Sequence, residues 1–332
     1  MTAEYIGIDL HKAFFQACVV TPAGDRVWEG RFARTADGIA RFVARGVSAS
    51  HAIAVEASGP TWAFVDALQP TGAHVCVIDP RKTRLKAGFA AKTDRLDARR
   101  LADALRRESV VSIYVPPPAI RELREVCRGR HQVVRLRTRL AQMIRALLLR
   151  CDAGEPPTTQ LYSPRALAWL AAVQLAPDAD RTLRRLERLY RAVHADAHAA
   201  DLEVRQRAKT DPIAIALDDL VGIGPVMALT IRAEMGDIAR FRNGPALASY
   251  AGLVPRVESS ADRVYRGRIT RDGSPWLRWA LVLAARHAIR RDDPRARWAR
   301  RLAVRKGINK ARVALARVLC DHVVSTWRQQ HS

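Results

Sequence analysis

The 332-residue sequence has few cysteines, few aromatic residues and no long apolar run, and these shortages exclude several classes of protein. The five cysteines are far apart and never spaced as C-x-x-C, which excludes a disulfide scaffold and a cysteine-rich zinc site. Such cysteine usage is typical of a reducing cytosol, so we expect a cytoplasmic protein. No apolar run reaches the roughly 18 residues that a transmembrane helix needs. Because acidic and strand-like residues follow the first methionine at once, we expect no signal peptide.

Acidic residues are also scarce, with 33 against 56 lysines and arginines, which gives a formal net charge of +23. A GC-rich coding bias enriches arginine, but it does not by itself explain so large an excess of basic over acidic residues. An excess of this size favours a polyanionic partner, and nucleic acid phosphate is the leading candidate. Residues 1–110 carry a net charge of +4 and the rest of the chain +19. We therefore expect nucleic acid to bind mainly outside the N-terminal part, in a nucleoid-associated protein.

The pattern of residues 1–114 predicts an α/β domain. Strand-like runs occupy 5–9, 13–20, 26–32, 52–55 and 74–78, and helix-like runs occupy 35–45, 61–68 and 94–107. The first three strands are separated by short turns and suggest a meander, whereas strands and helices alternate afterwards. This order predicts a mixed sheet covered by helices.

Three consecutive prolines at 116–118 mark a boundary, after which the pattern becomes helical. Residues 115–206 contain two long amphipathic runs, 119–150 and 179–206, which predict a helical hairpin or coiled coil. Residues 207–332 form a last, mostly helical part that is rich in arginine. The expected architecture is α/β plus all-α, in three parts.

Four acidic residues of the N-terminal part stand where a ligand site is expected. Asp9 and Glu56 each end a strand-like run, at the edge where loops open. Asp94 and Asp97 are three residues apart, which places both on one helix face. Four converging carboxylates repel each other unless cations compensate them, and two divalent ions about 3.5–4 Å apart use such a set in phosphoryl transfer. An ordinary strand end and a solvated helix start explain the same residues without a metal.

Three segments around these acids, 6–12 (IGIDLHK), 55–59 (VEASG) and 92–102 (KTDRLDARRLA), resemble the blocks of the insertion-sequence-110 family of transposases. These are DEDD recombinases, and the resemblance implies a RuvC-like (RNase H-like) fold for the N-terminal domain. It also implies a site that holds Mg²⁺, with two ions expected. The family's four acidic residues fall on Asp9, Glu56, Asp94 and Asp97.

The last part contains two further motifs. The run Leu220–Pro225 resembles a helix-hairpin-helix turn, in which Gly222 and Gly224 let backbone N–H groups approach a phosphate. A tight turn between two helices, with no ligand, explains the same glycines equally well.

The segment from 251–253 (AGL) to Gly273 resembles the family's carboxy-terminal transposase block, which carries a nucleophilic serine. Matching the block places that serine on Ser259. Ser260 is the alternative, because the alignment needs a shift of one residue near Arg256. We expect the polar stretch 263–272 to be a loop at this site.

The resemblance implies cutting and rejoining of DNA through a phosphoserine, at a site composed with the carboxylates of another subunit. It further implies an element-encoded guide RNA and a homodimer or homotetramer held by the long central helices. Arginines of the serine block and lysines of a basic stripe near the C-terminus are candidates to bind phosphate. These residues are Arg256, Arg263, Arg266, Arg268, Arg271, Lys306 and Lys310.

Three other functions remain open at this stage. A RuvC-like junction endonuclease uses water in place of the serine and forms no covalent adduct. A degenerate transposase binds nucleic acid without catalysis. A sugar kinase of related fold also opens with Gly7-Ile8-Asp9, but the chain has no phosphate loops and its C-terminal parts are strongly basic.

Overall fold

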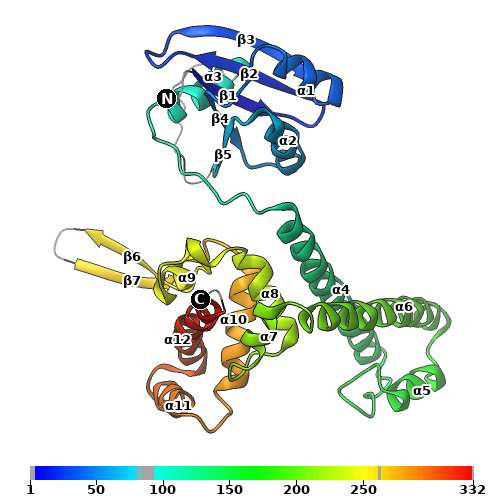
Figure 1. Ribbon diagram of the computed structural model, residues 1–332. Coiled ribbons are helices and arrows are strands. Elements are labelled where there is room, and N and C mark those ends of the chain that lie inside the picture. Colours follow the sequence, from blue (N-terminus) through cyan, green and yellow to red (C-terminus); the bar gives the residue numbers. More distant parts are fainter. Residues whose placement is uncertain (1–3, 81–82, 84–92, 261–262, 331–332) are drawn as a thin grey trace. The chain divides into compact units, whose positions relative to one another are not determined.

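The computed structural model describes residues 4–80, 83, 93–260 and 263–330. The chain divides into two compact units, Met1–Pro116 and Pro117–Ser332, which we describe separately (Figure 1). The first unit ends close to the predicted boundary at residue 114. The helical middle and the last part lie together in the second unit, so their division at residue 206 stays a prediction.

The first unit is built on a five-stranded mixed sheet, as the sequence predicts. Its strands are β1 (Glu4–Leu10), β2 (Phe14–Val20), β3 (Arg26–Ala33), β4 (His51–Glu56) and β5 (His74–Ile78). The spatial order is β3-β2-β1-β4-β5. The first three strands form an antiparallel meander, and β4 runs parallel to β1 and to β5. The predicted runs therefore coincide with the strands to within one or two residues.

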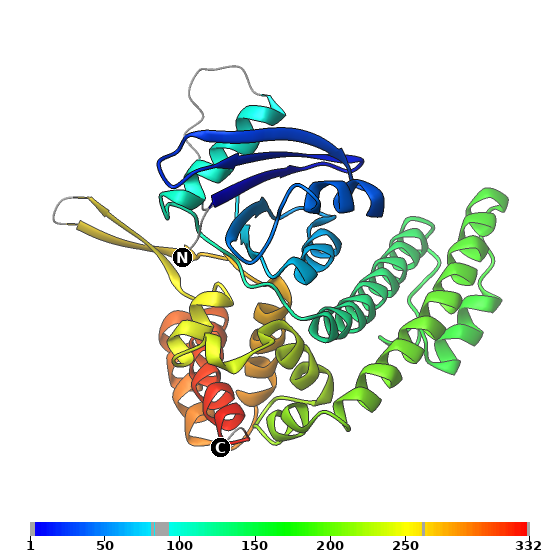
Figure 2. The ribbon, with the colours of Figure 1, turned by 45° about the horizontal axis from the view of Figure 1, so that its top comes forward.

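Helices cover both faces of this sheet. On one face, Ile6 and Ile8 of β1 pack with Phe42 of α1 (Ala36–Val43) and Phe64 of α2 (Thr61–Leu68). On the other face lies α3 (Asp94–Arg106), whose alanines pack on Cys18 and Val20 of β2 (Figure 2). Side chains alternate between the two faces along each strand. The odd-numbered residues of β1 and the even-numbered residues of β2 and β4 therefore face α3.

Helix α3 crosses β1 at Gly7, where the two backbones are almost in contact. A Cβ atom at Gly7 would lie 1.9 Å from the Ala98 carbonyl oxygen and 2.4 Å from the Ala102 nitrogen. Small residues on the helix, Ala98 and Ala102, complete this close approach, and both are fully buried. The missing side chain at Gly7 thus sets the distance between α3 and the sheet.

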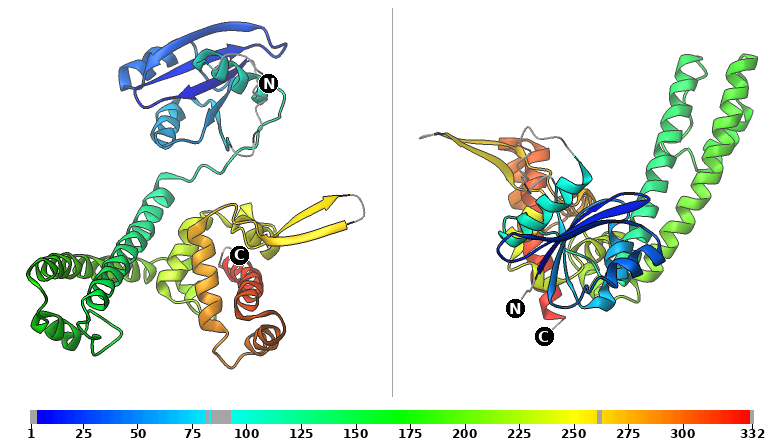
Figure 3. Two further views of the ribbon diagram at one scale, coloured as in Figure 1. Left: turned by 180° about the vertical axis from the view of Figure 1, so that it is seen from behind. Right: turned by 90° about the horizontal axis from the view of Figure 1, so that it is seen from above.

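In the second unit, α4 (Pro118–Arg150) and α6 (Pro177–Ala208) form the two predicted long helices and run side by side (Figure 3). Beside the ends of this pair, α5 (Pro164–Ala172) closes a small core that includes Ile144 and Tyr190. The sequence did not predict α5.

The larger core of the second unit lies among shorter helices. These are α7 (Pro212–Asp218), α8 (Pro225–Met235), α9 (Gly244–Tyr250), α10 (Pro275–Ala288), α11 (Pro294–Lys306) and α12 (Ile308–Gln329). The described residues also contain 3₁₀ turns at Gln69–Thr71 in the first unit and at Ile238–Arg240 here. Across the described part of the chain, no helix is both long enough and apolar enough to cross a membrane.

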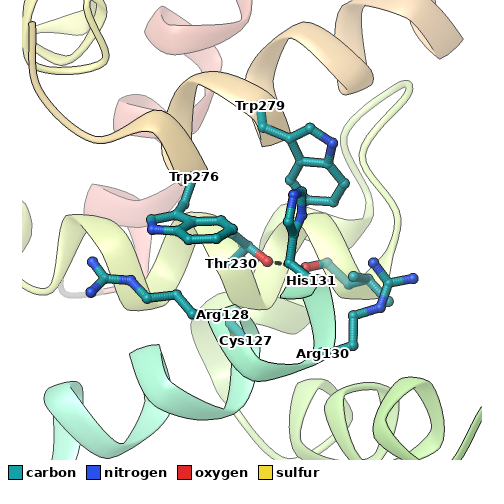
Figure 4. Close-up of a pocket in the computed structure, with 8 residues that line it drawn as sticks. Cys127, Arg128, Arg130, His131, Thr230, Trp276 and Trp279 are labelled. Atoms are coloured by element: carbon teal, nitrogen blue, oxygen red, sulfur yellow. Dashed lines mark hydrogen bonds between the residues drawn. The ribbon is translucent and has the colours of Figure 1, made fainter. Parts of the chain in front are cut away.

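Helix α4 is joined to this core by a buried ion pair. The Arg128 guanidinium donates to both carboxylate oxygens of Glu234, at 2.8 and 3.0 Å, and Glu234 is only 1% exposed. The Ser274 hydroxyl, which caps the start of α10, also donates to Glu234 at 2.9 Å. Nearby, His131 of α4 packs edge-on against Trp276 and Trp279 of α10 (Figure 4). These contacts fix the start of α10 against α4.

A two-stranded antiparallel hairpin, β6 (Pro255–Ser260) and β7 (Arg263–Ile269), projects from the helices of this unit (Figures 1 and 3). The expectation of a loop over 263–272 is therefore wrong for most of its length. The two strands are paired along the ribbon, from Pro255 opposite Ile269 to Ser260 opposite Arg263. Ser259 accordingly lies in a strand, opposite Val264.

The contact at Gly7 generates a test of the fold. Gly7→Ala places a methyl group against the α3 backbone, which cannot shift without moving the whole helix. We expect it to destabilise the first unit by about 1–3 kcal/mol or more, measured by urea unfolding. Gly59→Ala is the matched control, because its Cβ meets nothing within 4 Å and its unfolding free energy should stay within about 0.5 kcal/mol of the wild-type value. Equal unfolding free energies for the two variants would contradict the close approach.

Candidate metal centre and nucleic-acid interface

The ends of two neighbouring strands place Asp9 and Glu56 next to each other in the sheet. Strands β1 and β4 are parallel, with Ile8 opposite Val55, so Asp9 and Glu56 follow at the next position of each strand. Both residues belong to the set that faces α3. Strand pairing and alternation therefore bring two of the four predicted carboxylates to one edge of one face.

The start of α3 supplies the other two carboxylates. Thr93 caps the helix by accepting a hydrogen bond from the Leu96 amide, and Asp94 and Asp97 lie in the first turn. Acidic residues are favoured there because the N-terminal end of a helix carries a partial positive charge. The Arg100 guanidinium pairs with Asp97 at 3.1 Å.

His11 joins the two ends of this site. Its Nε2 atom lies 3.0 Å from Asp9 Oδ2 and 3.4 Å from Asp94 Oδ1. Asp9, His11 and Asp94 each offer a ligand atom, and these atoms lie within 4.8 Å of one another. The imidazole also stacks on Phe14, with ring centroids 4.6 Å apart. His11 belongs to the segment 6–12 but not to the ligand set that the sequence predicts.

The electrostatics agree with a shared site. Burial raises the pKa of the Asp9 carboxyl, the charges of Asp94 and Asp97 raise it further, and His11 opposes both effects. The charge of Asp97 thus also acts on Asp9, although Asp97 is not part of the closest group. For Glu56, the strand register is the observation that places it beside the others.

The donor set suits a divalent cation. Hard carboxylate oxygens are the ligands that Mg²⁺ and related ions prefer, and a cation offsets the repulsion that raises the pKa of Asp9. His11 supplies a nitrogen donor at the same point, and imidazole binds several first-row metals. The residues present therefore fit a divalent metal centre.

The ends of the predicted serine block meet at the base of the β6–β7 hairpin. Gly252, with φ +66°, lies close to the segment that follows β7. A Cβ atom at Gly252 would be 2.4 Å from the Asp272 carbonyl oxygen. A Cβ at Gly273, with φ +95°, would lie 1.9 Å from the Tyr250 carbonyl oxygen. The Arg278 guanidinium donates to the Ala251 carbonyl oxygen at 2.9 Å. Residues 20 positions apart in sequence thus form one tight junction.

Several predicted phosphate-binding residues are exposed, three of them on the β6–β7 hairpin or at its base. Arg256, Arg268 and Arg271 are exposed on it or at its base. Lys306 ends α11 and Lys310 lies in the first turn of α12, and both are exposed. The side chains of the remaining predicted residues lie outside what the structure describes; they are Ser259, Ser260, Arg263 and Arg266.

The Gly222–Gly224 turn has a packing role. It joins α7 to α8, and a Cβ at Gly222, with φ +90°, would lie 2.5 Å from the Ala284 carbonyl oxygen of α10. Gly224 caps the N-terminus of α8. The structure thus gives a physical reason for Gly222 that needs no phosphate, and phosphate binding by this turn stays a prediction.

Comparison with known proteins places both units beside one family. A family model described as "Transposase", for the DEDD domain of IS110 transposases, matches residues 6–151. A second, described as "Transposase IS116/IS110/IS902 family", matches residues 214–299, and the two matches together span more than two thirds of the chain.

Individual relatives agree with the family models. The transposase for insertion sequence element IS1111A of Coxiella burnetii is 28% identical over 94% of this chain and 86% of its own length. A probable family 20 transposase of Pseudomonas aeruginosa is 29% identical over 80% of each chain. An uncharacterised insertion element IS116 protein of Streptomyces clavuligerus is 24% identical over 87% of this chain.

The carboxylate site predicts a response to metal. Millimolar Mg²⁺ should raise the melting temperature of the first unit by several degrees, since an ion that binds only the folded state stabilises it by about 2.7 kcal/mol at 100 times its Kd. Asp9→Asn should melt higher than the wild type in EDTA, because it removes the charge whose pKa is raised, and should lose the Mg²⁺ increment.

Asp103→Asn is the control for the metal response, because Asp103 lies two turns further along α3 and pairs with Arg106. It should keep the whole Mg²⁺ increment. The same increment in wild type and Asp9→Asn, measured by calorimetry, would argue against a metal site at Asp9.

Proposed function

The chain belongs to the IS116/IS110/IS902 family of transposases, and we propose that it excises and inserts an insertion sequence by cutting and rejoining DNA strands. The observation that carries the proposal is the convergence of Asp9, Asp94 and His11 at one end of the mixed sheet, within a chain of net charge +23. The carboxylates suit a metal-assisted phosphoryl transfer, and the net positive charge suits binding to nucleic acid.

We propose that Asp9, Glu56, Asp94 and Asp97 hold Mg²⁺, as two ions. Such ions, when bound, stabilise the charge on the attacking and leaving oxygens of phosphoryl transfer. The residues themselves hold the ligand atoms in place: β1 and β4 fix Asp9 and Glu56, and the capped start of α3 fixes Asp94 and Asp97. His11 hydrogen-bonds Asp9 and restrains the orientation of its carboxylate.

Ser259 is the proposed nucleophile. Its Oγ atom attacks a DNA phosphate, a Ser–O–P bond forms, and the P–O bond to one deoxyribose oxygen breaks, so that this strand end leaves as a free hydroxyl. Attack by a deoxyribose hydroxyl on the phosphoserine reverses the exchange and rejoins a strand. The position of Ser259 in a projecting hairpin, whose base carries exposed arginines, supports this role. Those arginines would bind phosphate oxygens next to the reacting one.

The proposal includes two kinds of partner beyond the cut DNA. An element-encoded RNA would guide the choice of sites, so that base pairing reads sequence while the protein reads backbone shape. A homodimer or homotetramer would form through the central helices, and exposed apolar residues on α4 and α6 support this. They include Leu136, Met143, Leu189 and Leu202.

A covalent-trapping assay tests the chemistry. Protein, the RNA of the element, Mg²⁺ and end-labelled junction DNA are incubated and separated on a denaturing gel. We expect a protein–DNA adduct in the wild type that is absent in Ser259→Ala and in Asp9→Ala. Ser260→Ala is the matched control and should retain the adduct.

The outcomes separate the alternatives. Cleavage without an adduct would favour a junction endonuclease that uses water. An adduct that is lost in Ser260→Ala and kept in Ser259→Ala would move the nucleophile by one residue. Binding without cleavage by the wild type, with cognate RNA and DNA present, would favour a degenerate binder, and an unchanged yield without RNA would remove the guide from the proposal.

The basic surface predicts a salt dependence. Replacing Lys306 and Lys310 together by alanine should weaken binding to all DNA sequences and lower the slope of log K against log salt by about 2. Both lysines are exposed, so the melting temperature should not change. Fluorescence anisotropy across a salt series measures the slope, and an unchanged slope would exclude these lysines from the interface.

A further inference from the structure

A row of polar side chains leads across the sheet to the carboxylate site. Asp9 of β1 lies directly opposite Gln16 of β2, and Gln16 lies opposite Arg31 of β3. Directly opposite residues of antiparallel strands share a face. The face is that of α3, because Cys18, two residues after Gln16, packs against Ala98. The row therefore runs from the edge strand β3 to Asp9, beside the start of α3.

A hollow of about 280 Å³ lies along this row. Besides Gln16 and Arg31, residues of β3 and of the start of α3 line it. They are Glu29, Gly30, Thr93, Asp94 and Arg95. Asp94 is shared with the group formed by Asp9 and His11. The hollow thus opens directly beside the carboxylate site, and its volume is close to the roughly 300 Å³ at which binding sites for small molecules begin.

Gln16 is the unusual member of the lining. It is polar, yet only 4% exposed, and it stands between Asp9 and Arg31 in the row. An amide carries both donors and an acceptor, so it can pair with the edge of a base or with a sugar oxygen.

The charge along the hollow favours an anion at its outer end. Arg31 is exposed, and its guanidinium carbon lies 3.5 Å from the centroid of the Phe14 ring. Phe14 in turn stacks on His11 of the carboxylate site. The one acidic side chain of the lining outside that site, Glu29, is compensated by Arg26 at 3.5 Å and by Arg95 at 3.7 Å.

We propose that this hollow holds the nucleotide next to the phosphate that is cut, with Gln16 hydrogen-bonded to its base or sugar and Arg31 to its phosphate. Gln16 is then a substrate-binding residue, and the polar row is the path by which a single DNA strand reaches Asp9. The inference rests on the proposed function, because it takes the carboxylate site as the place of phosphoryl transfer. A neutral amide beside a cationic edge fits a nucleotide better than a free phosphate.

Local crosslinking tests this assignment in the full chain, where the basic second unit also binds DNA. The probe is a short single-stranded oligothymidylate that carries 4-thiothymidine, irradiated with the protein in Ca²⁺. Tryptic peptides are then mapped by mass spectrometry. The peptide of residues 13–26 contains Gln16 and should be labelled, whereas peptides of the second unit serve as internal controls.

Gln16→Met keeps the side-chain volume and removes the hydrogen bonds. Labelling of 13–26 should fall about fivefold or more, with labelling of the second unit unchanged and a melting temperature close to that of the wild type, because the side-chain volume is kept. Arg31→Ala should reduce the same labelling, and Arg41→Ala, an exposed arginine of α1 that pairs with Asp37, should not. Wild-type labelling in correctly folded Gln16→Met would overturn the inference.

Two further comparisons separate DNA from RNA as the ligand, and the nucleotide site from the serine chemistry. Stronger labelling of 13–26 by an oligouridylate with 4-thiouridine would overturn the assignment to DNA. The covalent-trapping assay is independent: an adduct in the wild type together with unchanged labelling in Gln16→Met rejects only the role of Gln16. Labelling that depends on Gln16, without any adduct, rejects the serine chemistry and leaves the nucleotide site standing.

Discussion

The carboxylate site depends on the close contact between α3 and β1 at Gly7. A side chain at this position would push the helix away from the sheet, because a Cβ there would meet helix backbone and not a movable side chain. With the helix held at this distance, its first turn ends beside the end of β1, and Asp94 comes within reach of His11 and Asp9. A residue with no functional group therefore determines the geometry of the functional ones.

The site stores unfavourable interactions in the free protein. Burial raises the pKa of Asp9, and the charges of Asp94 and Asp97 add to this effect. A cation would relieve this cost, so cation binding and folding are coupled at this place. The remaining framework compensates through ordinary packing, such as the aromatic cluster of Phe15, Phe42 and Phe64 on the opposite face.

Much of the first unit could be predicted, because strand alternation and strand ends are local signals. The runs around Asp9 and Glu56 and the start of α3 at Asp94 were found from the sequence alone. His11 and Gln16 were not found as site residues, since their importance arises from pairing across strands that no local pattern reveals. The β6–β7 hairpin was missed for another reason: the sequence of its strands shows no clear apolar alternation and reads as a polar loop.

The hairpin is attached to the second unit at one end only, where Gly252 and Gly273 bring two chain segments into contact. A change of angle at this junction therefore moves the whole length of the hairpin. A strand of six residues is about 20 Å long, so a rotation of roughly 10° at the glycine junction displaces the tip by about 3–4 Å. The buried Glu234 carboxylate accepts hydrogen bonds from Arg128 of α4 and from Ser274, the residue after Gly273. One carboxylate thus connects α4 to the base of the hairpin.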